Sequence, residues 1–135
     1  MKKVFLFYLL LAPFVFSQGL SKFEVVNIYI DSQENALVAY QIELTYDEDI
    51  EIVSIEAGQT KAFTHAPFYQ KTPKNKGKLV LASFTTKDEI APKGMNKFCS
   101  IHIRYTGKNE LRIKTLVKAA AKADDAARRA KCRNH

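Results

Sequence analysis

The hydrophobic pattern is clearest in the stretch LVAYQIELTYDEDIEIVSIEAG, residues 37–58, where two strand-like runs flank an acidic turn. In the first run, apolar side chains occupy every second position, at Tyr40, Ile42, Leu44 and Tyr46. A period of two is typical of a half-buried β-strand. The second run, residues 50–55, stops shortly before Gly58. A strand with one apolar face needs a second layer to cover it, so this pair of strands predicts a β-sandwich.

Further strands are predicted on both sides of this stretch. Residues 23–30 are rich in β-branched and aromatic side chains, and residues 79–84 are apolar enough to be covered on both faces. Residues 98–105 and 111–117 form two more strands, with a hairpin connection at residues 106–110. The prediction is an all-β, antiparallel sandwich that forms one domain over residues 18–135.

The tail, residues 118–135, is open between helix and strand. Residues 119–130 are rich in alanine, which favours a helix by intrinsic propensity. A final strand near residues 130–133 would instead complete the edge of a sheet. Propensity is a weak guide that tertiary contacts override, so both alternatives stand.

The N-terminus has the pattern of a secretory signal peptide over residues 1–17. Lys2 and Lys3 precede an apolar run of thirteen residues, and Val15-Phe16-Ser17 provides a cleavage site before Gln18. Thirteen apolar residues fall short of the ~20 that a spanning helix needs. We therefore expect a secreted, periplasmic or cell-envelope protein with no membrane span after cleavage.

Charge is distributed unevenly along the chain. The formal net charge is +7, and residues 18–60 contain nine acidic and one basic residue, whereas residues 61–135 contain eighteen basic and five acidic residues. Two separate charged surfaces would produce this pattern, but so would a sandwich in which the two halves interleave on neighbouring strands. The second interpretation is favoured because the charges alternate along predicted strands. Export argues against a nucleic-acid partner.

The two cysteines, Cys99 and Cys132, allow at most one disulfide. Cys99 falls in phase with Ile101, Ile103 and Tyr105, so it is expected in the core as a free thiol. Whether it pairs with Cys132 is left open by the sequence. No CxxC pair or histidine cluster predicts a metal site.

The densest group of carboxylates lies at the acidic turn: Asp47, Glu48, Asp49 and Glu51. Carboxylate oxygens are ligands for Ca²⁺. The run lacks the spacing of a calcium-binding loop, so a solvated turn is the favoured interpretation and Asp47, Asp49 and Glu51 are a weaker calcium candidate. No other cofactor is expected.

Three residues of an irregular segment beside Pro67 are candidates for binding: His65, Phe68 and Tyr69. Aromatic side chains on a loop stack on sugars or anchor a protein partner, although they also simply cap the open end of a sandwich. His102 alternates with buried positions and is expected to face solvent. No catalytic motif is present, since there is no Gly-x-Ser-x-Gly, no Cys-His pair at a turn and no phosphate loop, and we expect no enzyme.

Two stretches of the chain resemble cohesin-like domains. The run AYQIELTYDEDIEIVSIEAG is similar to the cohesin region in which a strand ending in Tyr-Asp leads into a Val/Ile-rich strand and a glycine. GKLVLASFTT and PKGMNKFCSIHIRYTG are similar to the later part, and the likeness spans residues 23–118. Its markers are Tyr46-Asp47, Gly58, Phe84 and Gly94. The resemblance implies a nine-stranded jelly-roll and a dockerin-type protein partner.

Three functional hypotheses follow from the sequence. The first is a secreted, non-enzymatic module that binds a dockerin-like or envelope protein in an extracellular assembly. The second is a carbohydrate-binding module that recognises a polysaccharide through loop aromatics, although the chain contains no tryptophan. The third is a structural protein of the envelope.

Overall fold

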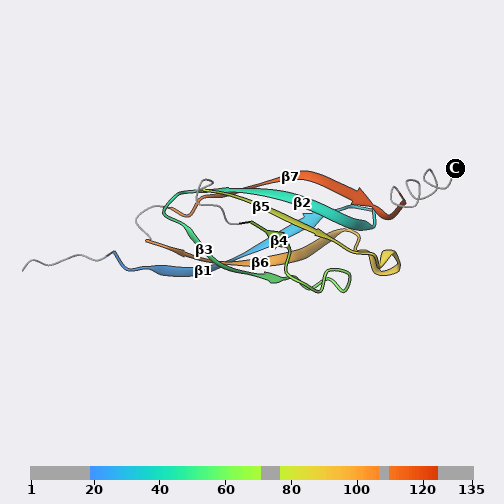
Figure 1. The fold of residues 1–135 in the computed structure, drawn as a ribbon, viewed down its shortest axis with the longest axis horizontal. Coiled ribbons are helices and arrows are strands. Elements are labelled where there is room, and N and C mark those ends of the chain that lie inside the picture. The colour runs from blue at the N-terminus through green and yellow to red at the C-terminus, as the bar shows by residue number, and fades with distance from the viewer. Residues whose placement is uncertain (1–18, 71–76, 107–109, 125–135) are drawn as a thin grey trace, which may run out of the picture.

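The computed structural model describes residues 19–70, 77–106 and 110–124, and these residues form a sandwich of two antiparallel sheets (Figure 1). The elements are, in chain order, β1 (Lys22–Asp31), β2 (Leu37–Tyr46), β3 (Glu51–Ala57), β4 (Phe68–Tyr69), β5 (Lys78–Phe84), the 3₁₀ turn η1 (Asp88–Ile90), β6 (Met95–Tyr105) and β7 (Ile113–Lys122). The all-β prediction is confirmed. Within these described residues there are seven strands, fewer than the nine that the resemblance implied.

One sheet has the strand order β1-β6-β3 and the other the order β4-β5-β2-β7. In Figure 1 the first sheet lies along the lower side and the second along the upper side. β2 and β3 therefore belong to different sheets, and the acidic turn between them crosses from one layer to the other. The pair of strands predicted from residues 37–58 supplies one strand to each layer of the sandwich.

The core forms where the inward faces of the two sheets meet. β2 contributes Tyr40, Ile42 and Leu44, each at most 3% exposed, as the alternation predicts. Tyr40 packs with Phe63 and Phe98, with ring centroids 4.9–5.5 Å apart and tilted or edge-on rings. Aromatic rings prefer such geometry because the positive edge of one ring meets the negative face of another. Phe63, in the irregular segment, is thus a core residue.

A β-bulge in β6 turns two neighbouring side chains into the core. In the pairing of β1 with β6, Ile28 lies opposite Cys99 and Tyr29 lies opposite Lys97, so Phe98 is the extra residue. A bulge breaks the strict alternation of a strand. As a result Phe98 and Cys99 are both almost fully buried, at 1% and 0% exposed. Burial of Cys99 confirms the prediction, and Cys132 lies outside the described residues.

The end of the second predicted strand is held by a close approach of two backbones. The Gly58 amide donates to the Phe98 carbonyl at 2.9 Å. A Cβ atom placed at Gly58 would lie 1.9 Å from the Lys97 carbonyl oxygen, which leaves no room for any side chain. Glycine at this position lets the chain leave β3 while it stays hydrogen-bonded to β6.

Two of the strand predictions are wrong. β5 is covered on one face only, because Leu79 and Leu81 are buried while Val80 and Phe84 are 37% and 65% exposed. Its outward side chains lie on the side of the sheet that the other layer does not cover. The connection after β6 is no hairpin either, because β6 and β7 lie in different sheets, and the sheet partner of β7 is β2.

The alanine-rich tail begins as a strand. β7 continues through Ala119, Ala120 and Ala121 to Lys122, paired with β2, and a helical turn starts only at residues 123–124. Alanine has the highest helix propensity of any residue, yet the backbone hydrogen bonds to β2 outweigh that preference here. Residues 125–135, which include the predicted strand near residues 130–133, lie outside the described part of the chain.

Charge pairs connect the acidic first half of the chain to the basic second half. Glu51 pairs with Arg104, Glu56 lies 3.2 Å from His102, and Asp47 lies 3.8 Å from Arg112. The interleaved arrangement is therefore confirmed for these charges, and His102 is half-exposed beside a carboxylate. Within residues 19–70, 77–106 and 110–124, no helix is long and apolar enough to cross a bilayer.

Candidate functional site

The outer face of the four-stranded sheet carries the most distinctive surface of the described chain. Strand pairing aligns its outward side chains in rows across the sheet. One row runs Phe84, Ala39 and Ala121, and the next runs Phe68, Ala82, Gln41 and Ala119. Further along β2 follow a row of Val80, Glu43 and Leu116 and a row of Lys78, Thr45 and Lys114. One end of the face is therefore apolar and the other is cationic.

Two exposed phenylalanines dominate the apolar end. Phe68 of β4 and Phe84 of β5 are 71% and 65% exposed, and their rings are nearly parallel at 14° with centroids 6.4 Å apart. Alanines on β2, β5 and β7 form a low floor beside the rings. The result is an open groove of about 370 Å³ whose apolar lining includes Phe68, Phe84, Ala82 and Ala119. We refer to this region as the aromatic–alanine groove.

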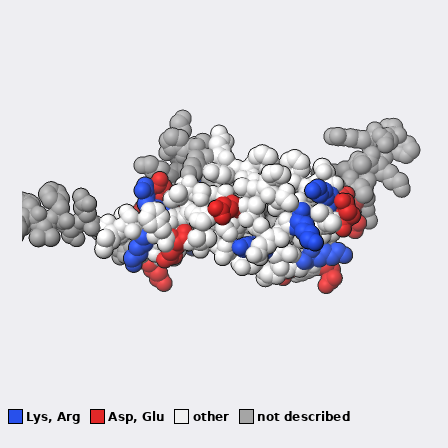
Figure 2. Space-filling model, turned by 90° about the horizontal axis from the view of Figure 1, so that it is seen from below, with Lys and Arg blue, Asp and Glu red and all other residues white. Residues whose placement is uncertain are grey.

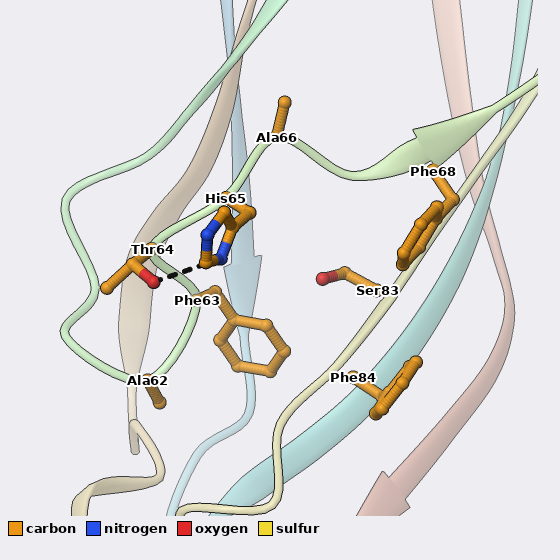
Figure 3. A pocket seen from close by; sticks show the side chains of 8 residues that line it. All are labelled: Ala62, Phe63, Thr64, His65, Ala66, Phe68, Ser83 and Phe84. Carbon is orange, nitrogen blue, oxygen red and sulfur yellow. Dashed lines mark hydrogen bonds between the residues drawn. The ribbon is translucent and has the colours of Figure 1, made fainter.

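A second hollow of about 200 Å³ lies on the other side of the same two rings. Phe63 and His65 line it from the segment after β3, while Ser83, Phe68 and Phe84 line it from the sheet (Figure 3). The Thr64 hydroxyl lies 3.2 Å from Nδ1 of His65. The two exposed phenylalanines line both depressions, and His65 and Thr64 add polar groups to the second one.

The cationic end is organised around Glu43. Its carboxylate lies 3.1 Å from the Lys78 ammonium and 3.6 Å from the Lys118 ammonium, on the two neighbouring strands. The hydrogen bond from Lys78, followed by the charge of Lys118, lowers the pKa of Glu43 below its usual value. Lys114, two rows from the groove, is exposed. Around Glu43 one carboxylate is shared by two lysines with a third nearby, so the outer face of the sheet here carries more lysines than carboxylates. The acidic turn, in which Asp47 pairs with Arg112, begins just beyond the Thr45 row.

The structure separates the three binding residues predicted from the sequence. Phe68 pairs with Ala82 and faces outward, whereas Tyr69 pairs with Leu81, which is fully buried, and so points to the opposite side of the sheet. Successive side chains of a strand alternate between its faces. His65 lies in the hollow beside Phe68. His65 and Phe68 therefore share a site that Tyr69 does not line.

The carboxylates of the acidic turn do not converge. Asp47 pairs with Arg112, Asp49 accepts a hydrogen bond from Thr106 at 3.4 Å, and Glu51 pairs with Arg104. Among the described residues, no group of three or more histidine, cysteine, aspartate or glutamate side chains is placed to hold a metal ion. The arrangement gives the calcium hypothesis for Asp47, Asp49 and Glu51 no support.

The outer face of the three-stranded sheet is different in character. Its polar side chains are joined in cross-strand pairs: Glu51 with Arg104, Glu56 with His102, and Asn27 with Ser100 at 2.8 Å. Figure 2 looks at this side of the molecule and shows a mostly uncharged middle with charges gathered toward the two ends. Exposed Phe23 and Val25 of β1 lie opposite Arg104 and His102, so apolar and charged positions alternate across the rows.

Sequence reasoning missed Phe84 and the lysines of the four-stranded face. The signal for Phe84 was present, because Val80, Ala82 and Phe84 alternate with Leu79, Leu81 and Ser83. This alternation was overlooked because residues 79–84 were predicted to be covered on both faces. Lys78 and Lys118 lie 40 residues apart in the chain, and the sheet pairing that brings both to Glu43 left no local trace in the sequence.

Comparison with solved structures identifies the fold. One chain of the Coh-OlpA-Doc918 complex, a type I cohesin–dockerin complex from Clostridium thermocellum, matches with a TM-score of 0.62 at 14% identity, over 76% of this chain and 78% of that chain. The seventh ScaB type I cohesin of Pseudobacteroides cellulosolvens matches at 0.56 and 15% identity, over 76% and 71% of the two chains. A non-cellulosomal cohesin from Archaeoglobus fulgidus matches at 0.52 and 12% identity, over 76% and 74%.

These similarities show that the chain has a cohesin-like fold, which confirms the resemblance seen in its sequence. At 12–15% identity the likeness concerns the fold alone. The sequence matches no protein-family model and no curated protein.

Proposed function

We propose that this protein is an exported, non-enzymatic binding module that recognises another protein through the outer face of its four-stranded sheet. The single observation that carries the proposal is the pair of exposed rings, Phe68 and Phe84, beside a groove with an alanine floor. Exposed aromatic side chains on a rigid sheet lose little entropy on binding and act as anchors at protein interfaces.

The cohesin-like fold supports a protein partner. One of the similar structures is a cohesin–dockerin complex, and a dockerin-type module or an envelope protein is the kind of partner that we propose here. Binding through a flat sheet face needs no cofactor and no catalytic group. Export rests on the pattern of residues 1–17, and cleavage after Ser17 is expected to give a mature N-terminus at Gln18. N-terminal sequencing of the protein from its native cell tests that step.

The binding experiment uses the purified protein as bait for the secreted and envelope proteins of its own cell. Each captured protein is then purified and its affinity measured by titration calorimetry. The double variant Phe68→Ala/Phe84→Ala is expected to weaken binding at least ~100-fold, since each aromatic anchor is expected to contribute about 1.4 kcal/mol or more and this amount is tenfold in affinity. Val25→Ala, on the three-stranded sheet, is the matched control and is expected to leave affinity unchanged. Equal loss in both variants would contradict the proposed face.

A second candidate function is carbohydrate binding. It is favoured by one specific feature, the nearly parallel exposed rings of Phe68 and Phe84 beside a hollow that contains His65 and Ser83. Sugar rings stack on aromatic faces and donate hydrogen bonds to such polar groups. A glycan array run with the wild-type protein and with Phe68→Ala distinguishes the two functions. Saturable glycan binding that Phe68→Ala abolishes would replace the protein partner by a polysaccharide.

A further inference from the structure

The apolar and cationic ends of the four-stranded face point to the chemistry of the partner. Both ends lie on the same uncovered side of one sheet, and strand pairing fixes their separation. The Thr45 row lies four residues along β2 from the Gln41 row and six residues from the Ala39 row. At about 3.3 Å per residue, the two ends are therefore ~13–20 Å apart.

The positive charge at the cationic end is only partly compensated within the described chain. Glu43 is shared by Lys78 and Lys118, and its own side chain is only 15% exposed, so it is covered by the two lysines rather than free to meet a partner. Lys78 and Lys118 remain 51% and 43% exposed beyond that contact. Lys114, aligned with Lys78 across Thr45, adds a third ammonium group to the same end.

A docked protein would remove water from these ammonium groups. Burying a charge without a partner is costly, so an interface that covers this end requires carboxylates on the other side. A second protein with a cationic surface would instead be repelled by several like charges at short range. The groove, by contrast, contains alanine and phenylalanine and favours an apolar side chain.

We infer that the partner is an acidic segment of a second protein, which places an apolar side chain in the aromatic–alanine groove and carboxylates ~13–20 Å further on, against Lys78 and Lys114. Lys118, beside the Gln41 row, lies between these two contacts. On a helix this separation corresponds to roughly 9–13 residues at 1.5 Å per residue. The inference rests on the proposed function, because it assigns the partner of the same face. It adds the requirement that the partner carries negative charge, which the aromatic anchors alone do not demand.

The test uses a phage-displayed library of helical mini-proteins with randomised surface positions, selected against the purified full chain. Selected binders are expected to be enriched in aspartate and glutamate at one end and in large apolar residues at the other. Lys78→Glu/Lys114→Glu is expected to weaken them at least ~tenfold, since reversing close charges across an interface costs that much or more. Their affinity for the wild-type protein is expected to fall as salt is raised.

Two further variants separate the possible results. Lys22→Glu/Lys97→Glu makes the same change in net charge on β1 and β6 of the other sheet and is expected to alter affinity by less than ~threefold, because distant charges are screened. Phe68→Ala/Phe84→Ala reports whether the face is used at all. Binders that lose affinity in the phenylalanine variant but not in Lys78→Glu/Lys114→Glu, or that carry lysine and arginine at this end, overturn the acidic partner and leave the proposed function in place. Binders indifferent to both variants overturn the proposed function.

Discussion

The two outer faces of the sandwich differ in how their charged and apolar side chains are arranged. On the three-stranded sheet, Glu51 pairs with Arg104 and Glu56 lies beside His102, each partner being on the neighbouring strand. On the four-stranded sheet, Glu43 is shared by two lysines, and Phe68 and Phe84 stand exposed beside alanines. The difference supports the proposal that binding takes place at the four-stranded face.

The largest expected effect on stability comes from removing one aromatic ring from the core that lies between the two sheets. Phe98→Ala deletes a ring that is 1% exposed and packed against Tyr40 and Phe63, so it is expected to lower the free energy of unfolding by about 3–5 kcal/mol. Phe84→Ala removes the same ring from the outer face and should change stability by no more than ~0.5 kcal/mol. Urea denaturation of both variants measures the contrast. Similar losses would mean that Phe84 belongs to the core.

The rate at which a thiol reagent labels Cys99 tests whether the core between the two sheets stays closed to solvent. The side chain is fully buried, and burial raises the pKa of the Cys99 thiol to about 12. The thiolate is the reactive form, and at pH 8 it would then be about one part in ten thousand, against roughly a quarter for an ordinary thiol of pKa ~8.5. In a Cys132→Ser background, a thiol reagent is expected to label Cys99 at least ~100-fold more slowly in buffer than in denaturant. Rapid labelling of the folded protein would show that the two sheets open.

Acid should distinguish the two faces, because the lowered pKa of Glu43 belongs to the four-stranded one. A carboxyl whose pKa is lower in the folded than in the unfolded state stabilises the fold above its unfolded pKa, and this contribution is lost as the pH falls through the folded value. Glu43→Gln is therefore expected to be less stable than wild type at pH 6, with the difference shrinking below pH ~4.5. Urea midpoints measured from pH 6 to pH 2.5 follow the change.

The matched control for that experiment is Glu34→Gln, in the exposed turn between β1 and β2. Its difference from wild type is expected to be small at every pH. A wild-type and a Glu43→Gln profile that run parallel down to pH 2.5 would contradict a stabilising role for the pairs of Glu43 with Lys78 and Lys118.

The smallest effect concerns the edge of the four-stranded face. Ala120 lies in β7, opposite Tyr40, and is exposed. Valine suits a strand better than alanine does, so Ala120→Val is expected to leave stability unchanged or to raise it by up to ~0.5 kcal/mol. In a helix the same change would cost about 0.5 kcal/mol. A thermal denaturation series that includes Ala120→Gly as the common destabilising control decides between strand and helix.

The sequence by itself determined the layers. Alternation at Tyr40, Ile42 and Leu44 identified the inward face of β2, and the same period in β6 placed Cys99 in the core. These inferences succeeded because the side-chain period of a strand is a local property, fixed by the backbone whatever the strand pairs with. The cohesin-like resemblance was visible for the same reason, since it rests largely on this periodicity.

Tertiary structure alone decided which strands are neighbours, and with them the composition of the site. Pairing with β2 made a strand of Ala119–Ala121 against their helix propensity, brought Lys78 and Lys118 to one carboxylate, and set Phe68 beside Phe84. It also put β2 and β3 in separate sheets. The periodicity of the sequence does not show which strands pair, because the backbone of any sequence can form the hydrogen bonds between strands. These contacts between distant residues were therefore not predictable from the local pattern.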